Sequence, residues 1–438
     1  MHNDPGSREA IALEEVGHTD VSRGVARGLL VVLVTTMAMS TLVEVVQPAS
    51  QGSRGPKPWV RLASLISQIP SAVQTAFSEG ILAGNRRLYG VIDTFEDGLE
   101  EDSALIALVQ PPTQLLLTRW LGAGNEEVYP GFEGWLYFRP DVDSLTSAPF
   151  LAPEVLRLRG RGGDQWSPPP QPDPLLAIAK LRRQVEAAGA ELLVIPTPVK
   201  PAIHPEMFSS RFADAREPIR NPSEKDFAAS LREMGTVVFD PAVVMAEARQ
   251  ETGQAQFLRT DTHWTPGAVD HVARELAALI RTRYGLKPVM RFDRRDAVAE
   301  NLGDLAVKLR LPPGQSLVTP EAVRVRRVFG LDGQPWKPDP EADVLLLGDS
   351  FTNVFSAPEL GWGTAAGLAE QLSFHLGRPV DRLAVNAGGA HATRGALRRA
   401  AASEQDRLAG KRLVLYQFAN RELTGGNWKL FNQPRMSR

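Results

Sequence analysis

The sequence predicts an α/β protein: a doubly wound parallel sheet with helices on both faces, preceded by a single N-terminal transmembrane helix. Three observations lead to this fold class. From about residue 174 onward, five short apolar strands alternate with segments of helical periodicity. Residues 344–350, Val-Leu-Leu-Leu-Gly-Asp-Ser, have the continuous apolar run and tight turn of a buried parallel strand. An uncharged apolar stretch at residues 28–43 lies close to the N-terminus.

Composition excludes several classes of function. The 438 residues are 43% hydrophobic and 23% charged, which is typical of a globular chain with room for two or three domains. A formal net charge of -2, without a basic run interleaved with aromatics, argues against a nucleic-acid partner. The absence of cysteine excludes disulfides, thiolate metal sites and a cysteine nucleophile. The seven histidines show no His-Glu-X-X-His or similar spacing, so we expect neither a metal nor a cofactor.

The N-terminal region predicts a tail and a membrane anchor. Residues 1–24 are mostly polar, carry both signs and show no apolar period. The predicted anchor, residues 25–46, has an uncharged core of about 24 Å as a helix, and flanking valines extend it toward the ~30 Å of a hydrocarbon layer. A signal peptide and a buried core helix are the competing interpretations. The long polar segment before the apolar run and the lack of a clear cleavage site favour an uncleaved anchor.

The region between the anchor and the main domain is predicted to be a linker followed by helices, over residues 47–125. Residues 48–57 are rich in Ser, Gly, Pro and Gln, as a linker is. From Trp59 to about Gly122, apolar residues recur at helical spacing. The predicted main domain covers residues 126–438. Near its start, residues 131–138, Gly-Phe-Glu-Gly-Trp-Leu-Tyr-Phe, predict a Gly-bounded aromatic strand.

The elements of the main domain follow from their apolar patterns. The predicted strands are residues 191–195, 236–239, 344–347, 383–385 and 413–418. The predicted helices are residues 174–188, a segment from about 223, and residues 266–284, 363–376 and 393–404. In open α/β sheets, ligands bind at the carboxyl ends of the strands. The Gly-Asp-Ser turn therefore makes Ser350 a candidate nucleophile, although such a turn is also typical of a simple helix cap.

A second motif, Asp-Thr-His-Trp-Thr-Pro at residues 261–266, supplies candidate partners for Ser350. Thr265 as N-cap and Pro266 as the first helical residue place Asp261 and His263 in the preceding loop. Residues two apart in an extended loop project to the same side, so the carboxylate can orient the imidazole. Alone, the pair is also typical of caps and loops. With Ser350 it completes a nucleophile, base and orienting carboxylate, in an order that argues against an α/β-hydrolase.

Together, Gly-Asp-Ser-Phe at residues 348–351 and Asp-Thr-His-Trp at 261–264 resemble the alginate O-acetyltransferase family of AlgJ and AlgX. The catalytic domain of that family is similar to SGNH hydrolases, which implies a flavodoxin-like doubly wound sheet. The likeness covers most of residues 120–430. It includes residues 131–138, 196–200, 204–206, 303–305, 361–363, 386–390 and 421–428. His204 departs from the pattern, because a Tyr is expected there.

The resemblance implies that Ser350 is the nucleophile, His263 the general base and Asp261 its orienter. The implied activity moves an acetyl group, through an acetyl-serine, onto hydroxyls of an exported, alginate-like polysaccharide. A membrane-bound O-acyltransferase is the expected partner that delivers the acetyl group. The topology follows: the anchor crosses the inner membrane once, the tail lies in the cytoplasm and the catalytic domain faces the periplasm.

Further residues are candidates for the oxyanion and the substrate. The Ser350 backbone N–H can help to hold an oxyanion, and Asn386 and Gly388, at the end of another strand, are candidates for the second donor. Trp362 could stack on a sugar ring, and Arg394 could meet a sugar carboxylate. Burial in the core is the alternative for the tryptophan, and a solvated or salt-bridged surface position is the alternative for the arginine.

Lys200 and Arg421 are subject to the same two interpretations as Arg394: contact with an anionic sugar or a surface position. Two other functions stay open. An acetylesterase would use the same triad and pass the acetyl group to water, a difference that depends on whether the acceptor groove excludes water. A non-catalytic polysaccharide-binding or assembly subunit would keep the fold without using the site, although all three triad residue types are present.

Overall fold

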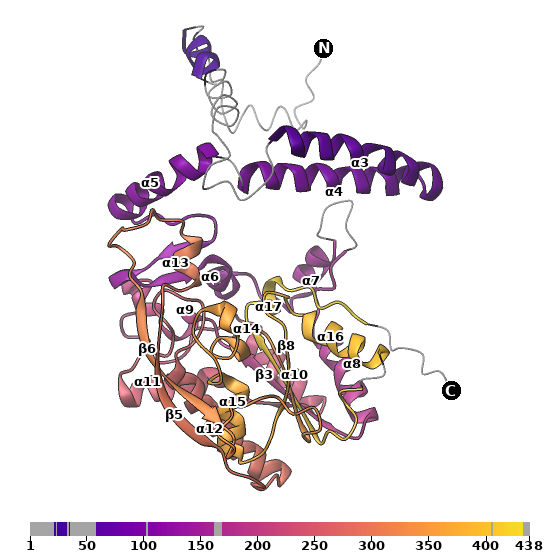
Figure 1. The fold of residues 1–438 in the computed structure, drawn as a ribbon, viewed down its shortest axis with the longest axis vertical. Helices are drawn as coiled ribbons and strands as arrows, with labels where there is room; N and C mark the ends of the chain where they lie inside the picture. Colours follow the sequence, from indigo (N-terminus) through magenta and orange to yellow (C-terminus); the bar gives the residue numbers. More distant parts are fainter. Residues whose placement is uncertain are drawn as a thin grey trace. The chain divides into compact units, whose positions relative to one another are not determined.

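The computed structural model describes residues 22, 24–32, 35, 58–101, 104–161, 169–403 and 406–431. They belong to two compact units, residues 1–110 and 111–438, and each is described by itself (Figure 1). Of the predicted anchor, the structure describes residues 25–32 and 35, as helix, and the rest lies outside the described residues. Within the described ranges, no helix has both the length and the apolar character needed to cross a membrane. The anchor, like the predicted domain boundaries, stays a prediction.

The helical character predicted for residues 59–122 is confirmed. The region contains α3 (Pro58–Glu79), α4 (Ile81–Glu101) and α5 (Ala104–Leu121). Helices α3 and α4 pack against each other and are separated by Gly80 alone, whose φ of 101° breaks the helix. Their contact is close, because a Cβ added at Gly84 would lie 2.3 Å from the Cβ of Ala76. Glycine is therefore required where these two helices meet.

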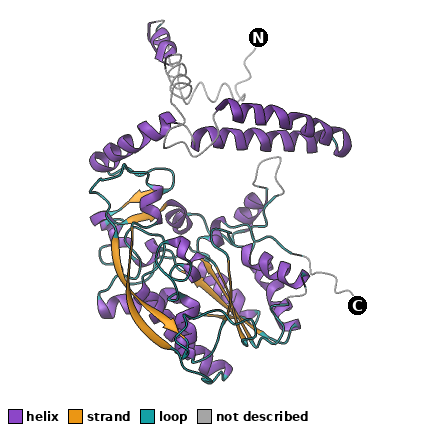
Figure 2. Cartoon of the chain, viewed as in Figure 1, coloured by secondary structure: helices purple, strands orange, loops and turns teal. Residues whose placement is uncertain are grey.

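A five-stranded parallel sheet forms the centre of the second unit (Figure 2), as the sequence predicts. Its strands are β3 (Glu191–Thr197), β4 (Val237–Val238), β7 (Val344–Gly348), β8 (Asp381–Ala384) and β9 (Leu413–Ala419). Their spatial order is β4-β3-β9-β7-β8. The expectation of a flavodoxin-like order is wrong in one respect: the last strand, β9, lies between β3 and β7 instead of at the edge. The fold is nonetheless SGNH-like α/β.

Alternate residues of the central strands enter two separate cores. Leu193 and Leu346 pack on one face with α11 (Pro241–Thr252), α12 (Pro266–Tyr284) and α15 (Leu368–Leu376). Leu192 and Leu345 pack on the other face with α8 (Pro174–Ala187), α10 (Glu224–Glu233) and α16 (Ala392–Ala402). Figure 1 shows α12 and α15 on one side of the sheet and α8 and α16 on the other. Burial on both faces explains why each strand is a continuous apolar run.

Two predicted elements differ from the structure. The aromatic segment at 131–138 is not a single strand. It contains the 3₁₀ turn η1 (Phe132–Gly134) and strand β2 (Leu136–Phe138), which forms a hairpin with the preceding β1 (Val128–Pro130). Its chain reverses because Glu133 and Gly134 have φ of 54° and 78°. The predicted helix 363–376 begins only at Leu368, in α15, because Gly363 and Ala365 have φ of 93° and 60°.

The sequence prediction missed a long antiparallel ribbon of β5 (Asp293–Asn301) and β6 (Glu321–Phe329). The remaining helices are α6 (Arg139–Thr146), α7 (Pro153–Gly160), α9 (Lys200–Ile203), α13 (Asp304–Lys308), α14 (Ser350–Asn353) and α17 (Glu422–Gly425). Three further 3₁₀ turns are η2 (Pro205–Met207), η3 (Ser210–Phe212) and η4 (Pro358–Leu360). Of these elements, α6, α13, α14 and α17 carry residues around the candidate site.

Candidate active site

Ser350 is held at the carboxyl end of β7 by a tight turn into α14. The whole of β7 is buried, and Gly348 ends it at a point where a Cβ would lie 2.1 Å from Oγ1 of Thr352. Asp349 caps α14, because its Oδ1 accepts a hydrogen bond of 2.9 Å from the N–H of Phe351. Ser350 is therefore the first residue of a helix whose entry is fixed by its neighbours.

The same turn is attached to the adjacent strand β9. Oδ2 of Asp349 accepts a bond of 2.7 Å from the N–H of Ala419, and the N–H of Asp349 donates to Oε1 of Gln417 at 3.0 Å. Oγ1 of Thr352 also donates to this Gln417 oxygen, at 2.9 Å. The buried glutamine thus joins the turn to the sheet. These contacts give Asp349 a structural role in the turn.

The loop before α12 places His263 opposite the serine. Thr265 caps α12 by accepting a bond of 3.2 Å from the N–H of Ala268, and Pro266 follows as the first helical residue. The N–H of Leu258 donates to the carbonyl of His263 at 3.0 Å, which closes the loop. Within it, the N–H of His263 donates to Oδ1 of Asp261 at 3.0 Å. This local bond brings the two side chains to the same side.

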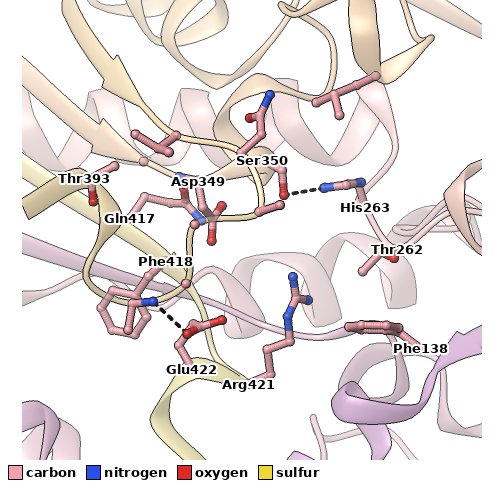
Figure 3. Close-up of a pocket in the computed structure, with 18 of the residues that line it drawn as sticks. Phe138, Thr262, His263, Asp349, Ser350, Thr393, Gln417, Phe418, Arg421 and Glu422 are labelled. Carbon is pink, nitrogen blue, oxygen red and sulfur yellow. Dashed lines mark hydrogen bonds between the residues drawn. The ribbon is translucent and has the colours of Figure 1, made fainter. Parts of the chain in front are cut away.

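The three candidate catalytic side chains form a continuous hydrogen-bonded chain. Nδ1 of His263 lies 2.6 Å from Oδ1 of Asp261, and Nε2 lies 2.8 Å from Oγ of Ser350 (Figure 3). With Nδ1–H donating to the carboxylate, Nε2 is free to accept the serine proton. The structure therefore brings together all three residues that the sequence singles out, in the geometry of a nucleophile, base and orienting acid.

Asp261 is buried, yet all of its hydrogen-bonding capacity is satisfied. Besides the two bonds from His263, its Oδ2 accepts from Nε1 of Trp362 at 2.8 Å and from the N–H of Asp304 at 3.0 Å. Burial alone would raise the pKa of this carboxyl, but the charge of His263 and the hydrogen bonds outweigh it and hold the pKa below its ordinary value. Asp261 is thus kept as a carboxylate.

Opposing effects act on the pKa of the His263 imidazole. Burial lowers its pKa, whereas the charge and hydrogen bond of Asp261, and then the charge of Asp304, raise it. Arg421 acts in the lowering direction. The net effect places the pKa of His263 above its ordinary value. The site therefore stabilises the imidazolium that forms when the serine gives up its proton.

Asp304 is a site residue that reasoning from local motifs missed. Its Oδ1 and Oδ2 accept bonds of 2.7 Å from the N–H and Oγ1 of Thr262. Gly303 precedes it with a φ of 87°, and a Cβ there would lie 2.4 Å from the carbonyl oxygen of Thr260. Burial and the neighbouring charge of Asp261 raise the pKa of the Asp304 carboxyl. The only signal in the sequence was Gly303-Asp304-Leu305 within the family resemblance.

Asp261, His263 and Asp304 also form a group whose ligand atoms lie within 4.8 Å of one another. Each carboxylate oxygen in this group already accepts a hydrogen bond from a protein N–H or O–H. These donors point into the lone pairs that a metal ion would need. The geometry therefore favours a hydrogen-bonded network over a metal centre.

A pocket of about 430 Å³ opens beside Oγ of Ser350. Its lining includes Asp304. Figure 3 shows His263 and Thr262 on one side of the pocket and Arg421 and Glu422 on another. NH1 of Arg421 donates to the buried Asp141 at 2.9 Å. Burial would lower the pKa of Arg421, but the charges of Asp141 and then Asp349 raise it above its ordinary value. Arg421 therefore stays positively charged at the pocket wall.

The candidate oxyanion residues lie at the pocket but differ in availability. Ser350 occupies the first position of α14, where a helix leaves its N–H without an intrahelical acceptor. Asn386 and Gly388 both line the pocket. The amide of Asn386 is engaged, because Nδ2 donates to Glu359 at 3.2 Å and Oδ1 accepts from Asn353 at 3.0 Å. Next to it, Ala387 has a φ of 52°, which marks a strained backbone.

Two of the candidate substrate contacts are not where the sequence places them. Trp362 is fully buried and donates to Asp261, so it has no face for a sugar ring. Arg394 is buried too. Its guanidinium donates to the carbonyls of Lys429, at 3.0 Å, and Ala390, at 3.3 Å, and it does not line the pocket. For Trp362 the alternative, burial in the core, is the correct one. For Arg394 both the sugar contact and the surface position are wrong, because its burial depends on packing partners distant in the chain.

Lys200 is likewise buried instead of solvated. Its Nζ donates to the carbonyls of Leu136, at 2.7 Å, and Arg259, at 3.2 Å. The N–H of Leu136 donates to the same Arg259 carbonyl at 3.0 Å. Burial lowers the pKa of Lys200 from 10.5 to about 8, although the charges of Asp261 and Asp304 act in the raising direction. Lys200 thus joins strand β2 to the loop that leads into Asp261.

Comparison with known proteins relates the chain to bacterial acetyltransferases. It is 27% identical over 231 residues to the probable alginate O-acetylase AlgJ of Pseudomonas aeruginosa, which covers 52% of this chain and 53% of that protein. The corresponding protein of Pseudomonas syringae pv. tomato is 26% identical over 238 residues, covering 52% and 55%. The chain thus spans about half the length of the curated relatives it matches.

A solved structure supports the same fold. The O-acetyltransferase domain of Pseudomonas putida AlgJ aligns with a TM-score of 0.51 and 20% identity, over 69% of this chain and 93% of that one. A family model described as "SGNH hydrolase-like domain, acetyltransferase AlgX" matches residues 163–420, more than half of the chain. The chain therefore belongs to the AlgX family of SGNH hydrolase-like acetyltransferase domains.

Proposed function

We propose that this protein is a polysaccharide O-acetyltransferase that works through an acetyl-serine intermediate. The observation that carries the proposal is the chain from Asp261 to His263, at 2.6 Å, and from His263 to Ser350, at 2.8 Å. These distances are within hydrogen-bond reach and join a hydroxyl nucleophile to a base and its orienter. Because the chain belongs to a family of acetyltransferase domains, we take the acyl group that such a triad would move to be acetyl.

In the first half-reaction, Oγ of Ser350 attacks the carbonyl carbon of the acetyl donor while Nε2 of His263 takes the hydroxyl proton. The tetrahedral oxyanion lies near the start of α14, where the Ser350 N–H can donate to it. Asp261 stabilises the imidazolium. When the intermediate collapses, the proton passes from His263 to the leaving group, which departs as the acetyl-serine forms.

In the second half-reaction, a sugar hydroxyl entering the pocket attacks the acetyl-serine. His263 removes the hydroxyl proton, and the second tetrahedral intermediate uses the same oxyanion donors. Collapse transfers the acetyl group to the sugar oxygen and returns the proton to Oγ of Ser350. Each oxyanion donor contributes roughly 3 to 4 kcal/mol to such steps.

The cellular setting is part of the proposal. The uncharged segment within residues 25–46 is the proposed single-pass anchor in the inner membrane, with the catalytic unit facing the periplasm. A membrane-bound O-acyltransferase is the proposed source of the acetyl group. The proposed acceptor is an exported polysaccharide. Alginate is the first candidate, because the relatives are named as probable alginate O-acetylases.

The proposal is tested with the full chain, an activated aryl acetate as donor and a uronic-acid oligosaccharide as acceptor. Aryl release and the mass of the oligosaccharide are followed together, for the wild type and for Ser350→Ala. We expect acetylated oligosaccharide from the wild type alone, with turnover lowered in Ser350→Ala by up to about 10⁶-fold. His263→Ala should be similarly impaired, and Asp261→Ala somewhat less.

The alternatives give different results in the same experiment. Aryl release without a change in the mass of any sugar offered would identify an acetylesterase. Neither signal from a folded wild-type chain would favour a non-catalytic polysaccharide-binding subunit. Near-normal turnover by Ser350→Ala would end the acetyl-serine proposal.

A further inference from the structure

Arg421 is held at the wall of the active-site pocket by contacts on several sides. Its NH1 donates to Oδ1 of the buried Asp141 at 2.9 Å. Its Cζ lies 5.4 Å from the ring centroid of Phe138 and 5.7 Å from that of Phe351. An ion pair to a buried carboxylate and two aromatic rings thus fix the orientation of the guanidinium. A ligand that binds it therefore pays little for ordering the side chain.

One edge of this guanidinium is not used by the protein. Among the described residues, none accepts a hydrogen bond from Nε or NH2 of Arg421, whose side chain is 19% exposed. Figure 3 shows the guanidinium pointing into the pocket that Ser350 lines. The Nε–H and one N–H of NH2 form a planar fork that matches the two oxygens of a carboxylate. The pocket wall therefore offers a bidentate site for a carboxylate.

The carboxylates that line the pocket are bound to other donors of the protein. Both oxygens of Asp349 accept from main-chain N–H groups, and Oε2 of Glu422 accepts from another at 2.8 Å. Both oxygens of Asp304 accept from Thr262. Burial raises the pKa of the Asp304 and Glu422 carboxyls. The fork of Arg421 thus faces the pocket without an acceptor of its own from these three acids.

Lys308 is the other lysine or arginine among the described residues that line the pocket. Its Nζ is paired with Glu127, which lies outside the lining. An ammonium group is also a point charge without a planar fork, so it does not recognise the shape of a carboxylate as a guanidinium does. Of these two cations, Arg421 is the one suited to select a carboxylate.

We propose that Arg421 selects a uronate acceptor: the free Nε–NH2 edge of its guanidinium binds the carboxylate of the sugar unit that enters the pocket at Ser350. In a hexuronate ring, the carbon that bears the carboxylate lies opposite C2, so this contact leaves hydroxyls on the other side of the ring free to meet the acetyl-serine. The inference rests on the proposed function, and it adds the residue that distinguishes a uronate from an uncharged sugar.

The test measures binding by calorimetry, with the full chain carrying Ser350→Ala as the parent so that no turnover occurs. The probes are tetramannuronate and its uncharged counterpart, mannotetraose. Removing Arg421 alone would leave Asp141 buried without its partner, which is strongly destabilising. The main comparison is therefore between Asp141→Asn and Asp141→Asn/Arg421→Met, which differ only at Arg421. Arg421→Lys keeps the charge and removes the fork, and Lys308→Met is the matched control for the loss of a charge at the pocket.

We expect the parent to bind tetramannuronate about 10- to 100-fold more tightly than mannotetraose, because hydrogen bonds between charged groups are the strong ones. Asp141→Asn should keep this preference, since the Asn oxygen still accepts from NH1. Asp141→Asn/Arg421→Met should lose the preference and bind mannotetraose like the parent. Arg421→Lys should weaken tetramannuronate binding by about 10-fold. Lys308→Met should weaken it by less than about 3-fold, because a partly exposed, paired charge contributes little.

Equal affinities of the parent for the two probes, or no binding of tetramannuronate, would overturn the inference. A preference for tetramannuronate that survives in Asp141→Asn/Arg421→Met would also overturn it, as would a loss in Lys308→Met as large as that in Arg421→Lys. The Tm of each variant is measured, and if the double variant does not fold, unchanged tetramannuronate affinity in Arg421→Lys overturns the inference.

The proposed function and this inference fail in different ways. The proposed function fails if the wild type binds tetramannuronate through Arg421 but transfers no acetyl group to any sugar. The inference alone fails if the wild type acetylates tetramannuronate and mannotetraose equally well.

Discussion

The indole N–H of Trp362 donates a hydrogen bond of 2.8 Å to Oδ2 of Asp261, on the side of the carboxylate that His263 does not use. Both side chains are buried, so water does not compete for the bond. With the N–H of Asp304 on the same oxygen, it fixes the plane of the carboxylate and thereby the direction of the imidazole. A tryptophan from outside the proposed triad thus orients its carboxylate.

Trp362→Phe should lower kcat by about 10- to 100-fold, because a hydrogen bond to a charged group contributes about 1.5 to 3 kcal/mol. The benzene ring keeps most of the packing but loses the N–H. Trp428→Phe is the control: its Nε1 donates to the carbonyl of Glu422 at 2.9 Å, outside the triad. Trp428→Phe should lower the free energy of unfolding and leave kcat unchanged. Equal kcat losses in the two variants would mean that the Trp362 bond does not orient the triad.

Asp304 and Asp261 should together set the pH dependence of kcat/KM. His263 must be neutral to accept the serine proton, so kcat/KM should rise as the imidazole deprotonates, with a midpoint above the ordinary histidine pKa. The charge of Asp304 is one of the causes that raise the pKa of His263. Asp304→Asn removes it, and the acid limb of kcat/KM should therefore move to lower pH.

A carboxylate on the surface provides the comparison for that shift. Asp296→Asn, on the exposed ribbon strand β5, also removes one negative charge and should leave the midpoint where it is in the wild type. The profiles are measured as kcat/KM for aryl acetate against pH. A midpoint that stays fixed or rises in Asp304→Asn would contradict the proposed electrostatic role.

The buried strands could be predicted from sequence because each signal is local. Residues 344–348 are apolar without a break, and a strand covered on both faces by helices requires such a run. The order of the strands could not be predicted in the same way. The position of β9 between β3 and β7 depends on pairing between residues more than 60 apart in the chain, such as Leu345 with Val414.

In the candidate site too, residues placed by local sequence signals could be predicted, and residues placed by contacts distant in the chain could not. Asp261, His263 and Ser350 could be predicted because a strand end and a helix start place them by local geometry. Asp304 could not, since its contact with Thr262 depends on a loop that returns 42 residues later. For Trp362 the sequence left sugar stacking and burial in the core open, because its neighbourhood contains nothing that reveals its contact with Asp261, a hundred residues away.

Gly348→Ala should displace Ser350, the proposed nucleophile. The new Cβ would lie 2.1 Å from Oγ1 of Thr352 and 3.1 Å from Oε1 of Gln417, the two groups that hold the turn to β9. Overpacking of this kind costs about 1 to 3 kcal/mol, and a shift of about 1 Å in a reacting group can cost on the order of 100-fold in rate. We expect both a lower Tm and a lower kcat.

Gly90→Ala is the matched control for that substitution. Gly90 lies in α4, and a Cβ there would meet nothing within 4 Å. In a helix interior this change should raise stability, by up to about 1 kcal/mol, with kcat unchanged. A Gly348→Ala chain with the Tm and kcat of Gly90→Ala would show that the turn accommodates a side chain without moving Ser350.

Lys200 should make stability depend on pH in the alkaline range. Its pKa is about 8 in the folded chain, because of burial, whereas the unfolded chain gives it the ordinary lysine pKa of 10.5. Between these values the unfolded chain binds more protons, so the free energy of unfolding should rise with pH. The full gain, on the order of 3 kcal/mol, is reached above the unfolded pKa and is absent below the folded one.

Lys200→Met should remove this pH dependence while leaving the carbonyls of Leu136 and Arg259 without their ammonium donor. The free energy of unfolding is measured by urea titration from pH 7 to about 11 in both chains, and the difference between them cancels the titration of other groups. The wild type should gain stability relative to the variant as the pH rises past 8. A constant difference across this range would mean that Lys200 keeps an ordinary pKa, and that its charge is compensated by Asp261 and Asp304 despite its burial.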